Sequence, residues 1–258
     1  MAGNAGMMTG PGTNTYLLGE REIVVLDPGP DDAQHLAAIL AAAGSAIRWV
    51  VVTHTHRDHS PLAAELARRT GAIVIGLSPP GDGRQDETFV PQHQPADGER
   101  LSLGDLELTA IHTPGHASNC VCYFLARERL LITGDHVLEG VSPVILPPDG
   151  SMGDYLNSID KLFAYDFEKI APGHGNLMDQ GKKVLEALRA HRLAREDKVL
   201  RNLDKLADAN LDALIPVVYD DVPADRHPWA RLTLQAHLIK LAHEGRVSEL
   251  NGIWRLLS

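Results

Sequence analysis

The feature that most constrains the fold is a histidine-rich stretch directly after an apolar run. The run Trp49–Val52 is short and β-branched, as is typical of a buried parallel strand, and residues 53–60 continue it as Thr-His-Thr-His-Arg-Asp-His-Ser. Side chains two positions apart on an extended backbone point the same way. We therefore expect His54 and His56 to project together from the end of this strand.

The end of the same stretch predicts a sharp turn into a helix. Ser60 is a preferred N-cap residue, and Pro61 is favoured at the first helical position. This turn would carry Asp58 and His59 toward a second point close to the first. The stretch is therefore predicted to seed two adjacent metal sites, because a solvated polar loop gives no physical reason for such a dense pattern of ligand side chains.

Three further candidate ligands follow strand-like segments later in the chain. His116 comes after Thr-Pro-Gly, Asp135 comes after Thr-Gly, and His174 comes after Pro-Gly. The glycines allow the tight turns that would present each side chain at the rim of a sheet. One such residue alone is a weak signal, but three in this order after the histidine stretch predict a joint role in binding metal.

The order of elements predicts an α/β fold. Strands and glycine-terminated helices alternate up to Gly76, as in parallel βαβ units, and hairpins follow at 99–112 and 121–133. Two segments rich in Pro and Gly, 77–98 and 136–153, are predicted to be long loops. Loops of this length in a compact domain are commonly lids or binding loops, so we expect them to govern substrate selectivity.

The pattern His-x-His-x-Asp-His after a hydrophobic strand, followed by His, Asp and His, resembles the metallo-β-lactamase superfamily of binuclear hydrolases. The resemblance implies an αββα sandwich of two mixed β-sheets flanked by helices. By the same resemblance, one metal ion would be held by His54, His56 and His116, and a second by Asp58, His59 and His174. Asp135 would bridge the two ions.

Two residues are expected to support the ligands from behind. The resemblance places Asp27, at the end of an early strand, as the acceptor of a hydrogen bond that orients a ligand histidine; the alternative is a simple turn acid. His136 follows Asp135 and is a weaker candidate, because adjacent side chains on extended backbone face opposite sides. Arg57 is expected to be solvated or ion-paired, with contact to an anionic substrate as the alternative.

The C-terminal part looks like a separate module. Helical patterns at 193–206 and 228–244 precede a predicted hairpin at 247–257 that turns at Asn251-Gly252. Helices followed by such a wing resemble a winged helix. Together with the strand around Thr13–Leu17 and the Gly134-Asp135-His136 motif, the tail resembles the lactamase-beta-2-like branch of the superfamily. We expect a catalytic domain at 1–190 and a winged-helix-like domain at 191–258.

The ligand types predict the chemistry. Imidazole and carboxylate suit zinc, and the same set accepts manganese or iron, so two divalent ions are expected. A hydroxide bridging the two ions would be the nucleophile. Asp135 would hold the ions together, and Asp58 would orient the nucleophile or accept its proton. The predicted substrate is an ester or thioester, with single-stranded RNA as the alternative and a non-catalytic binder of nucleic acid or protein as a third class.

Composition narrows the partners. The net charge is −10, and residues 1–190 carry 14 Lys and Arg against 24 Asp and Glu, whereas 191–258 carry 10 of each. Such a charge favours a small acyl substrate over a nucleic-acid backbone. No apolar run approaches membrane-spanning length, so no membrane partner and a cytoplasmic location are expected. A homodimer is left open. Cys120 and Cys122 are expected to pack in the core.

The apolar, proline-rich segment Val141–Pro148 has two interpretations. It is suited to form the wall of a pocket for an acyl group, since it lacks the Lys and Arg that a phosphate cradle would want. Alternatively, it packs the C-terminal module against the catalytic domain. The composition of the segment is equally compatible with both interpretations.

Overall fold

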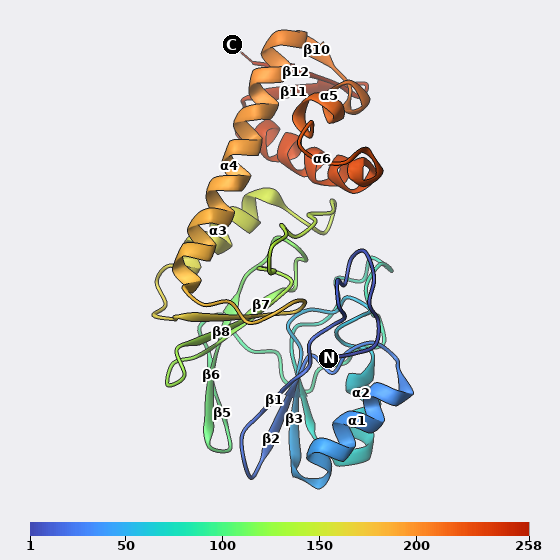
Figure 1. Cartoon of the computed structure of the whole chain (residues 1–258), viewed down its shortest axis with the longest axis vertical. Coiled ribbons are helices and arrows are strands. Elements are labelled where there is room, and N and C mark those ends of the chain that lie inside the picture. The colour runs from blue at the N-terminus through green and yellow to red at the C-terminus, as the bar shows by residue number, and fades with distance from the viewer. Residues whose placement is uncertain (258) are drawn as a thin grey trace.

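Two mixed β-sheets pack face to face in the computed structural model, which describes residues 1–257 (Figure 1). The first sheet has the order β1-β2-β3-β4. Its first pair is antiparallel and its other two pairs are parallel. The strands are β1 (Tyr16–Leu18), β2 (Ile23–Leu26), β3 (Ile47–Val51) and β4 (Ile73–Ile75).

The second sheet has the order β5-β6-β7-β8-β9. Neighbouring strands are antiparallel except β8 and β9, which are parallel. The strands are β5 (Arg100–Leu103), β6 (Leu106–His112), β7 (Val121–Leu125), β8 (Leu130–Gly134) and β9 (Lys169–Pro172). The predicted hairpins at 99–112 and 121–133 are thus confirmed as β5-β6 and β7-β8.

Strand β2 is covered on both faces, so it is apolar and buried at every position. In β2, Val24 and Leu26 face the second sheet, while Ile23 and Val25 face the helices on the other side. This is the two-residue alternation of a strand with both faces covered. The core between the sheets therefore consists of alternate residues from each strand.

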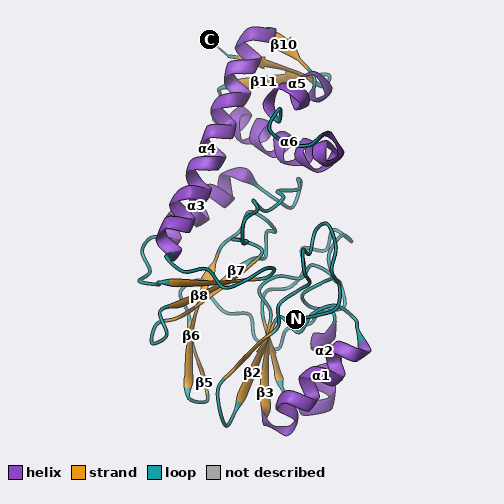
Figure 2. Ribbon diagram, in the orientation of Figure 1, coloured by secondary structure: helices purple, strands orange, loops and turns teal. Residues whose placement is uncertain are grey.

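Helices cover the two outer faces. Helices α1 (Ala33–Ala43) and α2 (Leu62–Thr70) pack on the first sheet, and α3 (Met152–Leu162) and the start of α4 (Gly181–Leu206) pack on the second (Figure 2). A short 3₁₀ turn, Gly44–Ala46, joins α1 to β3. These four layers confirm the expected αββα sandwich.

One predicted helix start is wrong. The structure begins α2 at Leu62, and Ser60 makes no capping hydrogen bond from its side chain. The Ser60 hydroxyl instead donates to Asp86 Oδ2 at 2.7 Å. A tertiary partner from the 77–98 loop therefore takes the hydroxyl that local sequence assigned to the helix end.

The C-terminal module has the expected helices and wing. It contains β10 (Asp208–Ala209), α5 (Leu211–Val218), a 3₁₀ turn (Ala224–Arg226), α6 (His227–His243), β11 (Val247–Leu250) and β12 (Ile253–Leu256). Asn251 and Gly252 both have positive φ, which is the type I′ geometry that an Asn-Gly hairpin adopts. The wing is therefore the predicted hairpin.

Helix α4 passes through the expected domain boundary between residues 190 and 191. Its first half packs on the second sheet through Leu185, and its second half packs in the C-terminal module through Val199 and Leu203. Figure 1 shows the module at the far end of this helix. Among the helices within residues 1–257, none combines the length and apolarity that a membrane crossing requires.

Candidate metal centre

The seven candidate ligands meet at one rim of the sandwich. The loop after β3 supplies the first four, and the segments after β6, β8 and β9 supply the other three. The ligand-capable atoms form two groups, and within each group they all lie within 4.8 Å of one another. The groups are His54, His56 and His116 on one side and Asp58, His59, Asp135 and His174 on the other.

The first group consists of three imidazoles. His54 Nε2 lies 2.9 Å from His56 Nδ1, and His116 Nε2 lies 3.0 Å from the same nitrogen. Burial, followed by the neighbouring imidazoles, holds the pKa of His54 well below its ordinary value. Burial and then His116 lower the pKa of His56 to about 3. Neutral imidazoles keep the lone pair that a metal ion needs.

The second group pairs two acids with two imidazoles. His59 Nε2 and His174 Nε2 both lie 3.4 Å from Asp135 Oδ1. Asp58 Oδ2 lies 3.4 Å from His59 Nε2 and 3.2 Å from His174 Nε2. Asp135 also reaches the first group, since its Oδ2 is 3.7 Å from His116 Nε2. Asp135 therefore stands between the two groups.

In the second group, the carboxylates favour positive charge at the imidazole nitrogens. Burial opposes protonation of His59, but Asp58, Asp135 and Asp27 outweigh it and raise its pKa well above the ordinary value. For His174, burial is outweighed by the nearby carboxylates of Asp135 and Asp58, and the pKa rises to about 10. Burial likewise opposes ionisation of Asp58 and Asp135, yet the nearby His59 keeps both pKa values below the ordinary one.

Oxygen atoms behind four of the rings fix their orientation. Asp27 Oδ2 accepts from His59 Nδ1 at 3.0 Å, and the carbonyls of Val144 and Gly12 accept from His116 Nδ1 at 2.8 Å and His174 Nδ1 at 3.1 Å. The Thr53 hydroxyl already donates to Asp27, so it accepts from His54 Nδ1 at 3.1 Å. Each of these rings therefore turns Nε2 toward its group.

Asp27 organises the start of the histidine loop as well. Its Oδ1 accepts from the Thr53 N–H and its Oδ2 from the Thr53 hydroxyl, each at 2.7 Å. It is buried and has a φ of 51°, a left-handed conformation that Asp tolerates better than most residues. The contact with His59 is the one expected from the resemblance.

Glycines next to the ligands permit close packing. A Cβ at Gly134 would lie 2.3 Å from Thr53 Oγ1, and a Cβ at Gly173 would lie 2.4 Å from Asp135 Oδ1. The first also has a φ of +49°. Any larger residue at either position would displace the ligand segment beside it.

Three buried polar atoms test whether a cation fits. His59 Nε2, Asp135 Oδ1 and His174 Nε2 have no hydrogen-bond partner within residues 1–257. Unpartnered buried polar atoms are costly, and here all three belong to the same group of convergent ligand atoms. The nitrogen and oxygen donors are of the types that bind divalent transition metals. The residues present therefore fit a divalent metal ion.

The loop 77–98 braces the histidine stretch from outside. The Thr55 hydroxyl donates to Gln85 Oε1 at 2.5 Å and accepts from Asn119 Nδ2 at 2.6 Å, while Asp86 N–H donates to Thr55 O at 2.8 Å. Residues Gln85–Thr88 of this loop line a separate hollow together with Arg57. Arg57 therefore borders a hollow that none of the seven candidate ligands lines.

A hollow of about 400 Å³ opens beside both groups. Its wall includes His116 and Asp135, together with side chains from the N-terminal segment, the 138–144 segment and the C-terminal module. They include Met7, Met8, Leu138, Val141, Val144, Arg226 and Trp229. The sequence predicts no role for Met7, Met8, Arg226 or Trp229, because their spacing carries no motif that would reveal one.

His136 lies outside both groups. Its imidazole is fully buried against Tyr155, with ring centroids 4.8 Å apart, and it makes no hydrogen bond or ion pair to the candidate ligands within residues 1–257. Burial, with the charges of His116 and Arg192, lowers its pKa to about 3. Asp135 and His136 therefore face opposite sides, and the structure gives His136 no supporting contact with a ligand ring.

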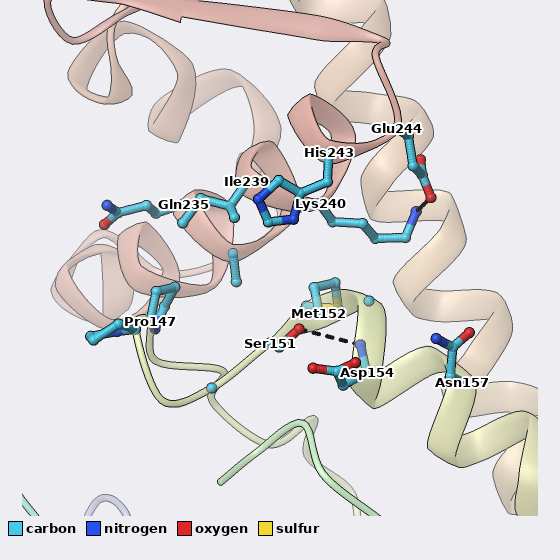
Figure 3. Close-up of a pocket in the computed structure, with 14 residues that line it drawn as sticks. Pro147, Ser151, Met152, Asp154, Asn157, Gln235, Ile239, Lys240, His243 and Glu244 are labelled. Atoms are coloured by element: carbon cyan, nitrogen blue, oxygen red, sulfur yellow. Dashed lines mark hydrogen bonds and ion pairs between the residues drawn. The ribbon is translucent and has the colours of Figure 1, made fainter. Parts of the chain in front are cut away.

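A larger hollow, about 660 Å³, lies between α6 and the 147–154 segment (Figure 3). Gln235, Lys240 and His243 of α6 line this space from one side, and Ser151 and Asp154 at the start of α3 line it from the other. None of the seven candidate ligands lines it. Size alone does not identify this hollow as a reaction site, because no candidate ligand lies in its wall.

A four-layer sandwich with two ligand groups on its rim defines a metallo-β-lactamase-type hydrolase. Residues 8–174 match the Metallo-beta-lactamase superfamily, and residues 211–254 match the Beta-lactamase associated winged helix domain. The chain therefore belongs to the metallo-beta-lactamase superfamily and is a hydrolase. Both the fold and the family expected from the sequence are confirmed.

Several relatives match nearly the whole chain. The Beta-lactamase-like protein 2 homolog of Drosophila melanogaster is 28% identical, covering 95% of this chain and 87% of its own length. The Atrochrysone carboxyl ACP thioesterase of Aspergillus chevalieri is 29% identical, covering 98% and 83%. A metallo-beta-lactamase family protein of Thermus thermophilus shares the fold, with a TM-score of 0.78, 24% identity and coverage of 95% and 94%.

Proposed function

We propose that this hydrolase binds two divalent metal ions and cleaves the ester or thioester bond of an acyl substrate. The observation that carries the proposal is the hollow of about 400 Å³, which has His116 and Asp135 in its wall and mainly apolar side chains around them. A substrate carbonyl could lie beside the ligand groups while its apolar part contacts Leu138 and Val144. The name of the thioesterase from Aspergillus chevalieri supports the same chemistry.

The donor atoms suggest how the ions would be held. His54 Nε2, His56 Nδ1 and His116 Nε2 would hold one ion, because these three nitrogens converge. Asp58, His59 and His174 would hold the other, and Asp135 would be shared because it contacts both groups. Zinc suits this set, with manganese or iron as alternatives. A structural relative with a TM-score of 0.56 was solved in a di-iron-bound form.

Bound ions would polarise the substrate carbonyl and supply a water of lowered pKa as the nucleophile. The protein's own groups set the conditions for this. Asp135 is nearly buried, whereas the Asp58 side chain is 25% exposed. Asp58 is therefore the acid that can orient a water and accept its proton at the open side. Thr13, whose hydroxyl lies 3.3 Å from Asp58 Oδ2, would hold that carboxylate in place.

Single-stranded RNA, the alternative substrate, has less support. Single-strand binding surfaces combine several cations with stacking side chains. The described residues that line the hollow include a single cationic side chain, that of Arg226. The helix before the wing, α6, packs against the catalytic layers through Ala236 and Thr233, so it is not free to enter a groove of nucleic acid.

A homodimer stays a prediction.

A substrate panel tests the proposal. Acyl thioesters, aryl esters, lactones and single-stranded RNA oligonucleotides would be assayed with zinc, manganese or iron added to the metal-depleted protein. We expect turnover of thioesters or esters that is lost in the Asp135→Asn variant. Cleavage of RNA alone, with no acyl substrate turned over under any metal, would overturn the proposed substrate class.

A further inference from the structure

The hollow beside the candidate ligands adjoins a second one. The 138–144 segment, Arg226 and Trp229 line both the first hollow and a neighbouring space of about 540 Å³ between α4, the 3₁₀ turn 224–226 and α6. The two spaces adjoin at this shared lining, and together we call them the groove. It leads from His116 and Asp135 to the junction with the C-terminal module. A substrate that fills this groove must be elongated.

The C-terminal module contributes one side of the groove. Trp229, in the first turn of α6, is 40% exposed and presents a flat apolar surface there. Val141 and Val144 of the catalytic domain line the same space. An aliphatic or aromatic segment between these walls would be removed from water on both sides, which is a main source of affinity in ligand pockets.

Arg226 is the uncommitted cation of the groove. The one hydrogen bond that it donates within residues 1–257 is that of its backbone N–H to Pro223 O, and its guanidinium makes no ion pair there. The other two arginines of the groove are engaged: Arg192 donates to Pro143 O, and Arg195 pairs with Asp221 at 2.6 Å. A free guanidinium beside apolar walls is suited to bind a carboxylate or phosphate oxygen.

We propose that Arg226 and Trp229 determine substrate specificity, and that the preferred substrate is an elongated ester or thioester with an anionic group separated from the scissile carbonyl by an apolar segment. This inference rests on the proposed acyl hydrolase function and adds the substrate's charge and shape. The anionic group can belong to the acyl part or to the leaving group, and the two sources are separated by experiment.

The first test compares matched substrates. Wild type, Arg226→Gln and the control Arg201→Gln, an exposed arginine of α4 outside the groove, would be assayed on three thioesters. Hexanoyl N-acetylcysteamine is neutral, adipoyl N-acetylcysteamine carries a carboxylate on the acyl part, and the hexanoyl thioester of 6-mercaptohexanoic acid carries a carboxylate on the leaving group, across an apolar chain. In wild type, kcat/KM should be higher for one charged substrate than for the neutral one.

In Arg226→Gln, that preference should fall about tenfold or more, the size expected for a lost charge-assisted hydrogen bond. Turnover of the neutral substrate should stay at the wild-type value, and Arg201→Gln should retain the preference. An unchanged preference in Arg226→Gln, or no preference in wild type for either charged substrate, would overturn the inference.

A second readout is independent of turnover. Calorimetric titration of the metal-loaded protein with phenylbutyrate and with the neutral phenylbutyramide measures the groove directly. Arg226→Gln should weaken phenylbutyrate binding about tenfold and leave the amide unaffected, while Trp229→Ala should weaken both. If no thioester is turned over, the proposed function fails, and this titration still decides the inference: equal affinities in wild type and Arg226→Gln reject it.

Discussion

Single residues that bind no metal decide where the histidine nitrogens point. Asp27 is the central example, because its two oxygens accept from the Thr53 backbone, the Thr53 hydroxyl and His59 Nδ1. It thereby fixes both the start of the histidine loop and the ring of one candidate ligand. Such supporting contacts commonly matter almost as much as the ligands themselves.

The Asp27→Asn variant tests this role. Asn tolerates the positive φ at this position, so the backbone conformation should be retained. The charged carboxylate that accepts the hydrogen bond from His59 is replaced by a neutral amide. We expect metal affinity or kcat/KM to fall about 10–100-fold, measured by competition with a chelating dye and by thioester turnover. Asp31→Asn, in the exposed turn nearby, should match wild type. Equal metal affinity in Asp27→Asn and wild type would reject the role.

Side-chain ligands can be predicted from the sequence, whereas backbone atoms that support them cannot. The seven candidate ligands could be predicted because His and Asp side chains recur in a dense, ordered pattern. The carbonyls of Gly12 and Val144 could not, since every residue offers a carbonyl and only the fold brings these two to a ring. Arg226 and Trp229 were likewise missed, because the sequence does not say which face of the C-terminal module meets the catalytic domain.

At the scale of elements, the segment 141–148 divides into two parts. Val141 and Val144 line the hollow beside the candidate ligands. Ile145 is fully buried in the core beneath α3 and α6, and its N–H faces the Thr233 hydroxyl at 3.4 Å. The pocket-wall interpretation therefore stays a prediction for Val141 and Val144, whereas Ile145 packs in the core. Composition could not separate the two roles, because both require apolar side chains.

Two substitutions separate the roles. Ile145→Ser should lower stability by about 3–5 kcal/mol, since it leaves a cavity and buries a hydroxyl, and thermal unfolding would measure it. Val141→Ser should leave stability unchanged and raise KM for apolar acyl substrates about three- to fivefold. Leu146→Ser, exposed but outside the hollow, should alter neither quantity. A large loss of stability in Val141→Ser with an unaltered KM would contradict the division.

At the scale of the whole molecule, a charge network around the buried Glu196 ties the second half of α4 to α6 and to the segment after it. Glu196 on α4 lies 2.8 Å from Lys240 of α6 and 3.3 Å from Arg246, with His237 3.9 Å away. Burial opposes its ionisation, but the neighbouring His237 and Lys240 outweigh that effect and lower its pKa below 4.5. The ionised carboxylate therefore stabilises the packing of α6, the helix that carries Trp229, against the second half of α4.

This lowered pKa predicts a pH dependence. Because the folded protein binds the Glu196 proton less tightly than the unfolded chain, the stabilisation is complete above pH 4.5 and is lost as the pH falls toward the folded pKa. Glu196→Gln should cost about 1–3 kcal/mol at pH 7, and the difference in melting temperature from wild type should narrow below pH 4.5. The exposed Glu186→Gln is the control. A difference that does not change with pH would reject a role for the ionised form.

Metal stoichiometry is the most direct measurement of the binuclear proposal. Elemental analysis would be performed on the protein after chelation, dialysis and reloading with zinc, with thioester turnover assayed in parallel. Wild type should hold two ions per chain, while His56→Ala and His174→Ala, one from each ligand group, should each retain about one. Turnover should vanish on chelation and return on reloading. Full turnover by metal-free protein, or one ion per chain in fully active wild type, would contradict a binuclear hydrolase.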